Sequence, residues 1–208
     1  MQYKNISTDL ILDFLSEFPE KFSTRKKKDR PDPNSTSGRE LIKKIIIDAK
    51  NKKVARVEPK TIPDPAVSII LKELYKVPEQ NLQKIKLEHQ YSMLAEDAVG
   101  ELLEDYIDYT SINSGAGWTR AYGDVIRSVD FIKKEDEGWR LLQIKNRDNS
   151  ENSSSQSVRD GTTIEKWFRT FSRSGKTNWN NFPDLILRNK LSEAGFFDHI
   201  KQYFSGIN

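Results

Sequence analysis

The chain of 208 residues contains no cysteine and only two histidines. The absence of cysteine excludes disulfides, thiolate catalysis and zinc sites built on cysteine, and two histidines are too few for a histidine-rich metal centre. Any metal ion that the protein holds must therefore be a hard cation bound through oxygen atoms. These constraints indicate Mg²⁺, with Mn²⁺ as a substitute.

The sequence also lacks any hydrophobic run that approaches the roughly 20 residues needed to cross a bilayer. Its first residues do not form a secretory signal, because Asp9 and Asp13 interrupt the apolar stretch. We therefore expect a cytoplasmic protein without a membrane partner. The net charge of +3 is compatible with nucleic-acid binding, but a mildly basic globular protein with another function fits it equally well.

Helical patterns dominate the first part of the chain. Apolar residues recur at helical spacing over residues 7–19, 38–51, 65–76 and, most strongly, 81–109. Residues 23–38 show no such periodicity and predict a loop, whose basic run contacts phosphates or is simply solvated. We therefore expect a helical N-terminal region at residues 1–80, either a subdomain or a cap, before a core at residues 81–208.

The patterns change to β-strands in that core. Residues 124–132 and 139–146 are rich in β-branched and aromatic side chains, and the charged turn KKEDEG separates them. The two segments predict a hairpin. A further helix is expected at about residues 163–172, with one or two more between residues 183 and 204.

One carboxylate and one lysine stand out on the predicted hairpin. Asp130 lies near the end of the first strand, and Gln143 and Lys145 are two residues apart, so they project to one face of the second. Phosphodiester hydrolysis needs a divalent cation held by oxygen ligands, and a lysine that stabilises charge and orients water. The predicted metal ligands are Asp130, Gln143 and the main-chain carbonyl of Ile144, and the predicted catalytic residues are Asp130, Gln143 and Lys145.

This arrangement resembles the PD-(D/E)xK nucleases at Ser128-Val129-Asp130 and Gln143-Ile144-Lys145. The sequence departs from their pattern where Ser128-Val129 replaces the loosely kept proline and where Gln143 replaces the second carboxylate. In relatives that accept this exchange, an acid on the preceding helix helps. Glu96 and Glu101 flank the apolar stripe of that helix, whereas Glu104 lies nearly opposite. The resemblance implies an α/β fold, a mixed central sheet flanked by helices, with Glu96 and Glu101 as supporting catalytic residues.

Simpler interpretations of the same residues stay open. The helix glutamates are equally well explained as solvated charges, and Asp130 with Lys145 as a cross-strand ion pair worth less than about 1 kcal/mol.

The segment after Lys145 is suited to reading DNA. Residues 139–176 carry eight Lys or Arg against four Asp or Glu, a net charge of +4. Arginine pairs with guanine, asparagine and glutamine pair with adenine, and serine holds phosphates. A flexible surface loop is the alternative. The predicted DNA-binding residues are Arg120, Arg147, Asp148, Asn152, Ser153, Ser154, Ser155, Arg159, Asp160, Lys166 and Arg169.

Three longer motifs carry a more specific resemblance: HQYSMLAEDAVGELLEDYI, GAGWTRAYGDVIRSVDFI and KNRDNSENSSSQSVRDGTTIEKWFR. Over roughly residues 88–173 the chain resembles type II restriction endonucleases of the SinI kind. The resemblance implies a homodimer that uses Mg²⁺ to cut double-stranded DNA at a short, partly palindromic, GC-rich site with an A/T centre. It also implies a restriction-modification system with a cognate DNA methyltransferase as genetic partner.

Three other functions compete with this hypothesis. The first is a structure-specific or repair nuclease on the same core, although the base-reading segment disfavours it. The second is a DNA- or RNA-binding protein without catalysis, which the missing carboxylate at Gln143 favours. The third is a structural α/β domain in which the motif is incidental.

Overall fold

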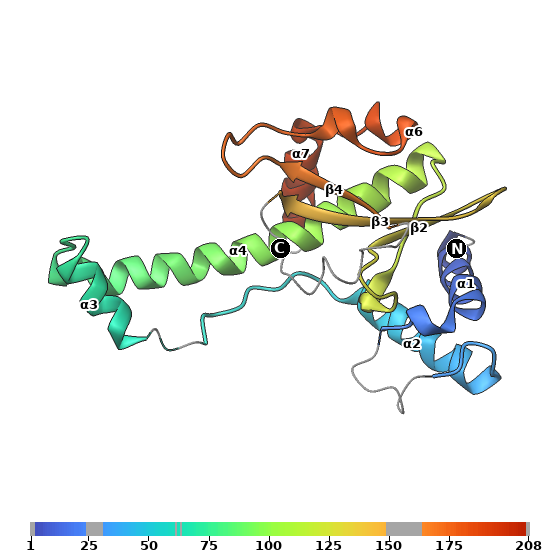
Figure 1. The fold of residues 1–208 in the computed structure, drawn as a ribbon, viewed down its shortest axis with the longest axis horizontal. Coiled ribbons are helices and arrows are strands. Elements are labelled where there is room, and N and C mark those ends of the chain that lie inside the picture. Colours follow the sequence, from blue (N-terminus) through green and yellow to red (C-terminus); the bar gives the residue numbers. More distant parts are fainter. Residues whose placement is uncertain (1–2, 24–30, 61, 63, 149–163, 207–208) are drawn as a thin grey trace. The chain divides into compact units, whose positions relative to one another are not determined.

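The computed structural model describes residues 3–23, 31–60, 62, 64–148 and 164–206 (Figure 1). Contacts divide the chain into two compact units, residues 1–53 with 102–208, and residues 54–101. The division therefore does not fall at the expected boundary near residue 80. It passes through one continuous helix, α4 (Glu79–Ser114).

The helices predicted for the first half are present, with adjusted ends. They are α1 (Tyr3–Glu17), α2 (Thr36–Asn51), α3 (Pro65–Glu73) and α4. Local capping explains two of these starts, because the side chain of Ser35 accepts the Gly38 N–H and that of Asp64 accepts the Ala66 N–H. Two C-terminal helices, α6 (Leu185–Arg188) and α7 (Glu193–Ser205), confirm the prediction for the tail.

A four-stranded mixed sheet lies in the unit of residues 1–53 and 102–208. Its strands follow in the order β1 (Thr119–Arg120), β2 (Phe131–Glu135), β3 (Gly138–Arg147) and β4 (Ile164–Thr170). The first three strands pair antiparallel, whereas β3 and β4 pair parallel. The predicted hairpin is confirmed as β2–β3, with Phe131 opposite Leu142.

Two predicted elements are wrong. The first strand of the hairpin begins at Phe131 and not at residue 124, because Asp124 and Ser128 adopt left-handed conformations (φ 51° and 59°) that a strand does not allow. The helix expected at residues 163–172 is strand β4. Its β-branched and aromatic side chains suit a strand, and parallel pairing with β3 outweighs the local helical pattern.

Helices cover both faces of this sheet (Figure 1). On one face, α1 and α2 bury Leu15 and Ile46 with Ile132 and Leu141 of the sheet. On the other face, Trp167 of β4 packs against Trp179 and Phe182, with ring centroids 5.1 and 5.0 Å apart. The sheet is therefore a rigid platform, and residues at its strand ends are held by a core on each side.

In the described part of the chain, no helix has the length and apolar character that crossing a membrane requires.

Candidate active site

Asp130 is the residue that immediately precedes β2, and it is fixed at three points. Its N–H donates to the carbonyl of Leu142 at 2.9 Å, and its carbonyl accepts the N–H of Ala121 at 2.8 Å. Its carboxylate Oδ2 accepts the N–H of Ile144 at 2.6 Å. Main-chain groups of β3 and of the segment after β1 therefore set both the position and the orientation of this carboxylate.

Burial raises the pKa of Asp130 from its ordinary 3.8 to about 6. The hydrogen bond from Ile144 and the positive charge of Lys145 oppose this rise, and the nearby Asp124 adds to it. The carboxylate is consequently costly to ionise in the protein alone. A cation placed beside it would relieve that cost, as expected of a metal ligand.

Gln143 on β3 follows Leu142, the partner of Phe131, and Asp130 immediately precedes Phe131, so both residues adjoin the same pair of the hairpin. Its side chain is only 4% exposed. Within the described part of the chain, its Oε1 is the one buried side-chain oxygen or nitrogen without a hydrogen-bond partner. Such an orphaned acceptor costs about 1–3 kcal/mol. An electropositive group near Oε1 would remove the penalty, which makes this oxygen a candidate ligand.

Lys145 is two residues beyond Gln143 and projects to the same face of β3. Between them, Ile144 directs its N–H to Asp130. In an extended strand the N–H and the C=O of one residue point to the same edge, so the Ile144 carbonyl also faces the Asp130 side. The structure thus places the four predicted groups at one end of the β2–β3 hairpin, and their metal-binding and catalytic roles stay predictions.

Strand β4 supplies the neighbours of this face. Parallel pairing sets Lys166 beside Gln143 and Phe168 beside Lys145. Directly paired residues project to the same face of a sheet, so a second lysine and an aromatic ring flank the candidate site. The sequence pattern predicts a helix at residues 163–172, so it does not predict that Lys166 and Phe168 lie beside Gln143 and Lys145.

The acids on α4 differ from the prediction in their placement. Glu104 pairs with Arg120 at 2.8 Å, in the same unit as Asp130. Glu96 and Glu101 are exposed residues of the other unit. Their supporting catalytic role stays a prediction.

Two of the predicted DNA-binding arginines are held inside the protein. Arg120 is 7% exposed, in its ion pair with Glu104. Arg169 donates to Asn146 at 3.0 Å, forms an ion pair with Glu193 and lies over the ring of Phe196. These contacts give both guanidinium groups internal partners, and their predicted contact with DNA stays a prediction.

The other predicted DNA-binding residues divide into two groups. Arg147 is exposed at the end of β3, and the carboxylate of Asp148 accepts the N–H of Ser172 at 2.8 Å. Lys166 lies on β4. The remaining predicted residues lie outside the described part of the chain: Asn152, Ser153, Ser154, Ser155, Arg159 and Asp160.

A buried acid of α4, Asp108, stabilises the segment that holds Asp130. The hydroxyl of Tyr122 donates to Asp108 Oδ2 at 2.7 Å, and the N–H of Arg120 donates to Oδ1 at 3.4 Å. Between them, Ala121 donates to the Asp130 carbonyl. Burial raises the pKa values of both Asp108 and Tyr122. Sequence reasoning misses Asp108, because nothing in its spacing separates it from the solvated acids of the same helix.

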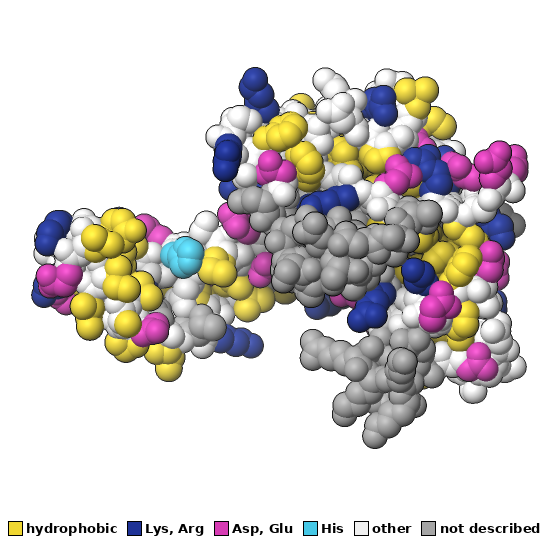
Figure 2. All heavy atoms as spheres, in the orientation of Figure 1, with side chains coloured by type: hydrophobic (Ala, Val, Ile, Leu, Met, Phe, Trp, Pro, Cys, Tyr) yellow, Lys and Arg dark blue, Asp and Glu magenta, His cyan; other side chains and the backbone are white. Residues whose placement is uncertain are grey.

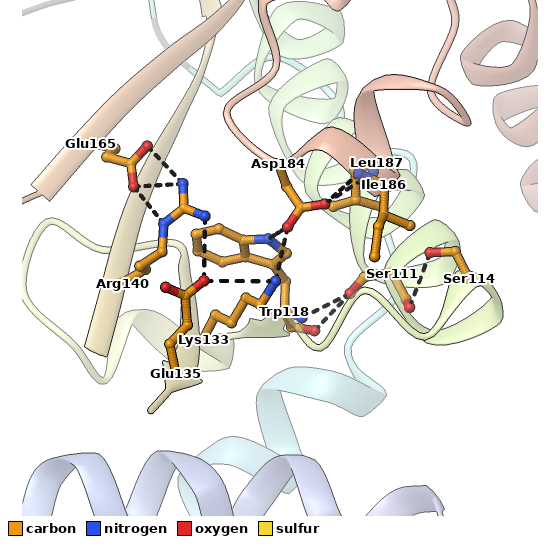
Figure 3. A network of polar contacts seen from close by, with 10 residues as sticks. All are labelled: Ser111, Ser114, Trp118, Lys133, Glu135, Arg140, Glu165, Asp184, Ile186 and Leu187. Carbon is orange, nitrogen blue, oxygen red and sulfur yellow. Dashed lines mark hydrogen bonds and ion pairs between the residues drawn. The ribbon is translucent and has the colours of Figure 1, made fainter. Parts of the chain in front are cut away.

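The opposite face of the hairpin carries a separate polar network, shown in Figure 3. Asp184 accepts hydrogen bonds from Lys133 at 2.9 Å and Trp118 at 3.0 Å, and it caps α6. Arg140 pairs with Glu165 of β4 at 2.9 Å. These residues anchor α6 and β4 to the hairpin, on the side away from Gln143.

Comparisons with known proteins identify the class to which the chain belongs. Two type II restriction enzymes, Eco47I from Escherichia coli and SinI from Salmonella infantis, are each 41% identical to the chain over 201 residues. Each match covers 95% of this chain and 86% of the relative. The mixed sheet with its acid, amide and lysine therefore lies in a chain of the restriction endonuclease class.

A family model described as SinI restriction endonuclease matches residues 4–206. The chain belongs to this family. The predicted resemblance, stated for residues 88–173, is confirmed and extends over nearly the whole chain.

Proposed function

We propose that this protein is a type II restriction endonuclease that hydrolyses phosphodiester bonds at a specific site in double-stranded DNA with the help of Mg²⁺. Family membership supports the activity. The observation that supports the metal is the buried, unpartnered Oε1 of Gln143, at the same end of the hairpin as the buried carboxylate of Asp130. Two oxygens that are each costly to bury alone are stabilised together by one hard cation.

The residues present fit such a cation. Asp130 offers a carboxylate, Gln143 an amide oxygen and Ile144 a main-chain carbonyl, all of which are ligands that Mg²⁺ accepts. In the ranges that the structure describes, no group of three or more His, Cys, Asp or Glu residues could hold a metal ion. The proposed site therefore depends on neutral oxygens as well as on one carboxylate. A PD-(D/E)xK core with glutamine at the second acidic position accounts for this composition.

The roles of the side chains follow from their positions. When bound, the metal ion polarises the phosphate and lowers the pKa of the attacking water. Asp130, oriented by the N–H of Ile144, would supply the negatively charged ligand. Lys145 projects to that face, where its ammonium stabilises the charge that develops on the phosphate and orients the water. Lys166 adds positive charge on the neighbouring strand.

Recognition is proposed to involve the basic segment that begins after Lys145. Arg147 is exposed at its start. The resemblance of this chain to type II restriction endonucleases of the SinI kind favours a short, partly palindromic, GC-rich target. A symmetric target is cut on both strands by a two-fold symmetric dimer, so we propose a homodimer with a cognate methyltransferase as genetic partner.

A second function is favoured by one observation. Gln143 provides no negative charge, so a catalytically silent DNA-binding protein would also use this sheet. Such a protein would bind DNA in a salt-dependent way without cutting it.

Plasmid cleavage by the purified chain tests the proposal. Parallel reactions contain Mg²⁺, Mn²⁺ or EDTA, and the ends of the products are sequenced. Discrete, metal-dependent fragments with one common terminal sequence are expected. Lys145→Ala provides the matched inactive control. Metal-independent cutting would refute the metal site, and DNA binding without cutting would favour the silent binding protein.

A further inference from the structure

Residues 54–101 form a unit with too small a core to stabilise itself. Among its described residues, Leu82 is the only buried hydrophobic side chain. Polar contacts connect α3 to α4, with Lys86 Nζ donating to Ser68 Oγ at 2.8 Å and Lys72 paired with Glu79 at 3.0 Å. A unit of this size with one buried side chain requires support from elsewhere.

The same unit exposes a large apolar surface. Nine large apolar side chains between Val67 and Met93 are 36–68% exposed. Hydrophobic side chains gather over α3 and the adjoining end of α4 in Figure 2. At roughly 200 Å² for a fully exposed side chain of this size, these nine present on the order of 900 Å². A stable interface of standard size takes about 800 Å² from each partner, so this surface is large enough for one.

The spacing of the exposed residues favours a helix as the partner. Val67, Ile70 and Leu74 are 43%, 51% and 68% exposed and recur at intervals of three and four residues along α3 and its C-cap. This spacing produces a narrow apolar stripe along one side of a helix, the pattern by which helices pack together. A stripe of this kind is best covered by a second apolar helix.

The net charge of α3 and the adjoining part of α4 favours a second copy of this chain over DNA as the partner. Residues 64–93 contain four lysines and four acidic residues, a net charge of zero. A surface that binds DNA carries an excess of positive charge, which this segment lacks. Two copies of a neutral surface approach without repulsion, and a two-fold axis lets the same patch cover itself.

We propose that the α3–α4 hairpin is the surface through which two copies of this chain form a dimer. This inference deepens the proposed function, since it names the interface of the homodimer that cutting both strands requires. Each hairpin buries its stripe of Val67, Ile70 and Leu74 against the partner's hairpin, and the pairing provides the core that each unit lacks.

The mass in solution tests this interface directly. Size-exclusion chromatography with light scattering is run on the full chain across a range of micromolar concentrations. The unaltered chain is expected to have twice the mass of one copy. The double variant Ile70→Glu/Leu74→Glu buries two unpaired charges in the interface, so its dissociation constant is expected to rise by roughly 100-fold or more.

The matched control is Leu41→Glu/Ile47→Glu on α2, where the same residue types are 49% and 50% exposed. The control is expected to remain dimeric, and circular dichroism verifies that both variants fold. If the α3 variant does not fold, Leu87→Glu replaces it, with Leu41→Glu as its control. A monomeric unaltered chain, or an α3 variant that stays dimeric, would overturn the proposed surface.

Cleavage assays separate this inference from the proposed function. An unaltered dimer that does not cut DNA would contradict the nuclease and leave the interface standing. An unaltered monomer that cuts DNA at one site would contradict the interface and leave the nuclease standing.

Discussion

Replacing Asp130 with asparagine should stabilise the metal-free protein while abolishing its activity. Asparagine has nearly the same volume, and its carbonyl oxygen accepts the hydrogen bond that Ile144 donates to the carboxylate. What the change removes is a charge that burial makes unfavourable. A pKa raised from 3.8 to about 6 means that ionised Asp130 destabilises the native state by up to about 3 kcal/mol.

The raised pKa determines how the stability contributed by Asp130 changes with pH. Because the pKa of Asp130 is higher in the native state than in the unfolded chain, its contribution to stability is fully present below pH 3.8. It is lost as the pH rises through about 6. The advantage of Asp130→Asn over the unaltered chain should therefore be under about 1 kcal/mol near pH 4 and about 3 kcal/mol above pH 7.

Urea unfolding in EDTA, measured between pH 4 and pH 8, supplies the comparison. Asp136→Asn, in the exposed turn between β2 and β3, is the matched control and should show no such trend. Equal stabilities of Asp130→Asn and the unaltered chain across the range would refute the reasoning, since they would mean that the carboxylate is ionised without cost. Added Mg²⁺ should stabilise only the unaltered chain.

Three further changes test the neighbours of Asp130. Lys145→Ala should reduce the cleavage rate by about 100-fold or more while specific DNA binding persists in a gel-shift assay; unchanged cleavage would remove Lys145 from the site. Gln143→Glu should retain cleavage and bind Mn²⁺ about tenfold more tightly at pH 8 in a calorimetric titration, because it adds a charge where Oε1 has no partner; an identical titration would place the side chain away from the ion. Tyr122→Phe should lower the free energy of unfolding by about 1–3 kcal/mol, because buried Asp108 loses a donor at 2.7 Å; unchanged urea unfolding would show that Asp108 does not need it.

The sequence predicts what depends on local pattern and on residue chemistry. Helical spacing locates α4, and β-branched runs with a charged turn locate the β2–β3 hairpin. The two-residue interval between Gln143 and Lys145 is enough to place both on one face. These predictions hold because each depends on residues that are close together in the chain.

The errors arise where distant residues decide the structure. Strand β4 forms because its main chain pairs with β3, and this pairing between distant segments outweighs the local helical pattern. Arg169 resembles a DNA-binding residue in the sequence, but Asn146 and Glu193 occupy its guanidinium. The partnership of Arg120 with Glu104 joins residues 16 positions apart, and the sequence offers no signal for it. A basic residue in a polar segment therefore indicates DNA contact only once such internal partners are excluded.

The glutamine at position 143 is consistent with the cost that Asp130 already carries. A second carboxylate opposite Asp130 would repel it and raise the pKa of both groups further, so the metal-free protein would lose more stability. Glutamine supplies an oxygen without that repulsion, although its orphaned Oε1 still carries a smaller penalty. The hydrogen bond that the Ile144 N–H donates to the Asp130 carboxylate offsets part of the cost of its charge and leaves the Gln143 penalty unchanged. One carboxylate balances only one of the two positive charges of the proposed cation. The negative phosphate of DNA would balance the other. Cation and DNA should therefore strengthen each other's binding, which links the charge of the site to the presence of its substrate.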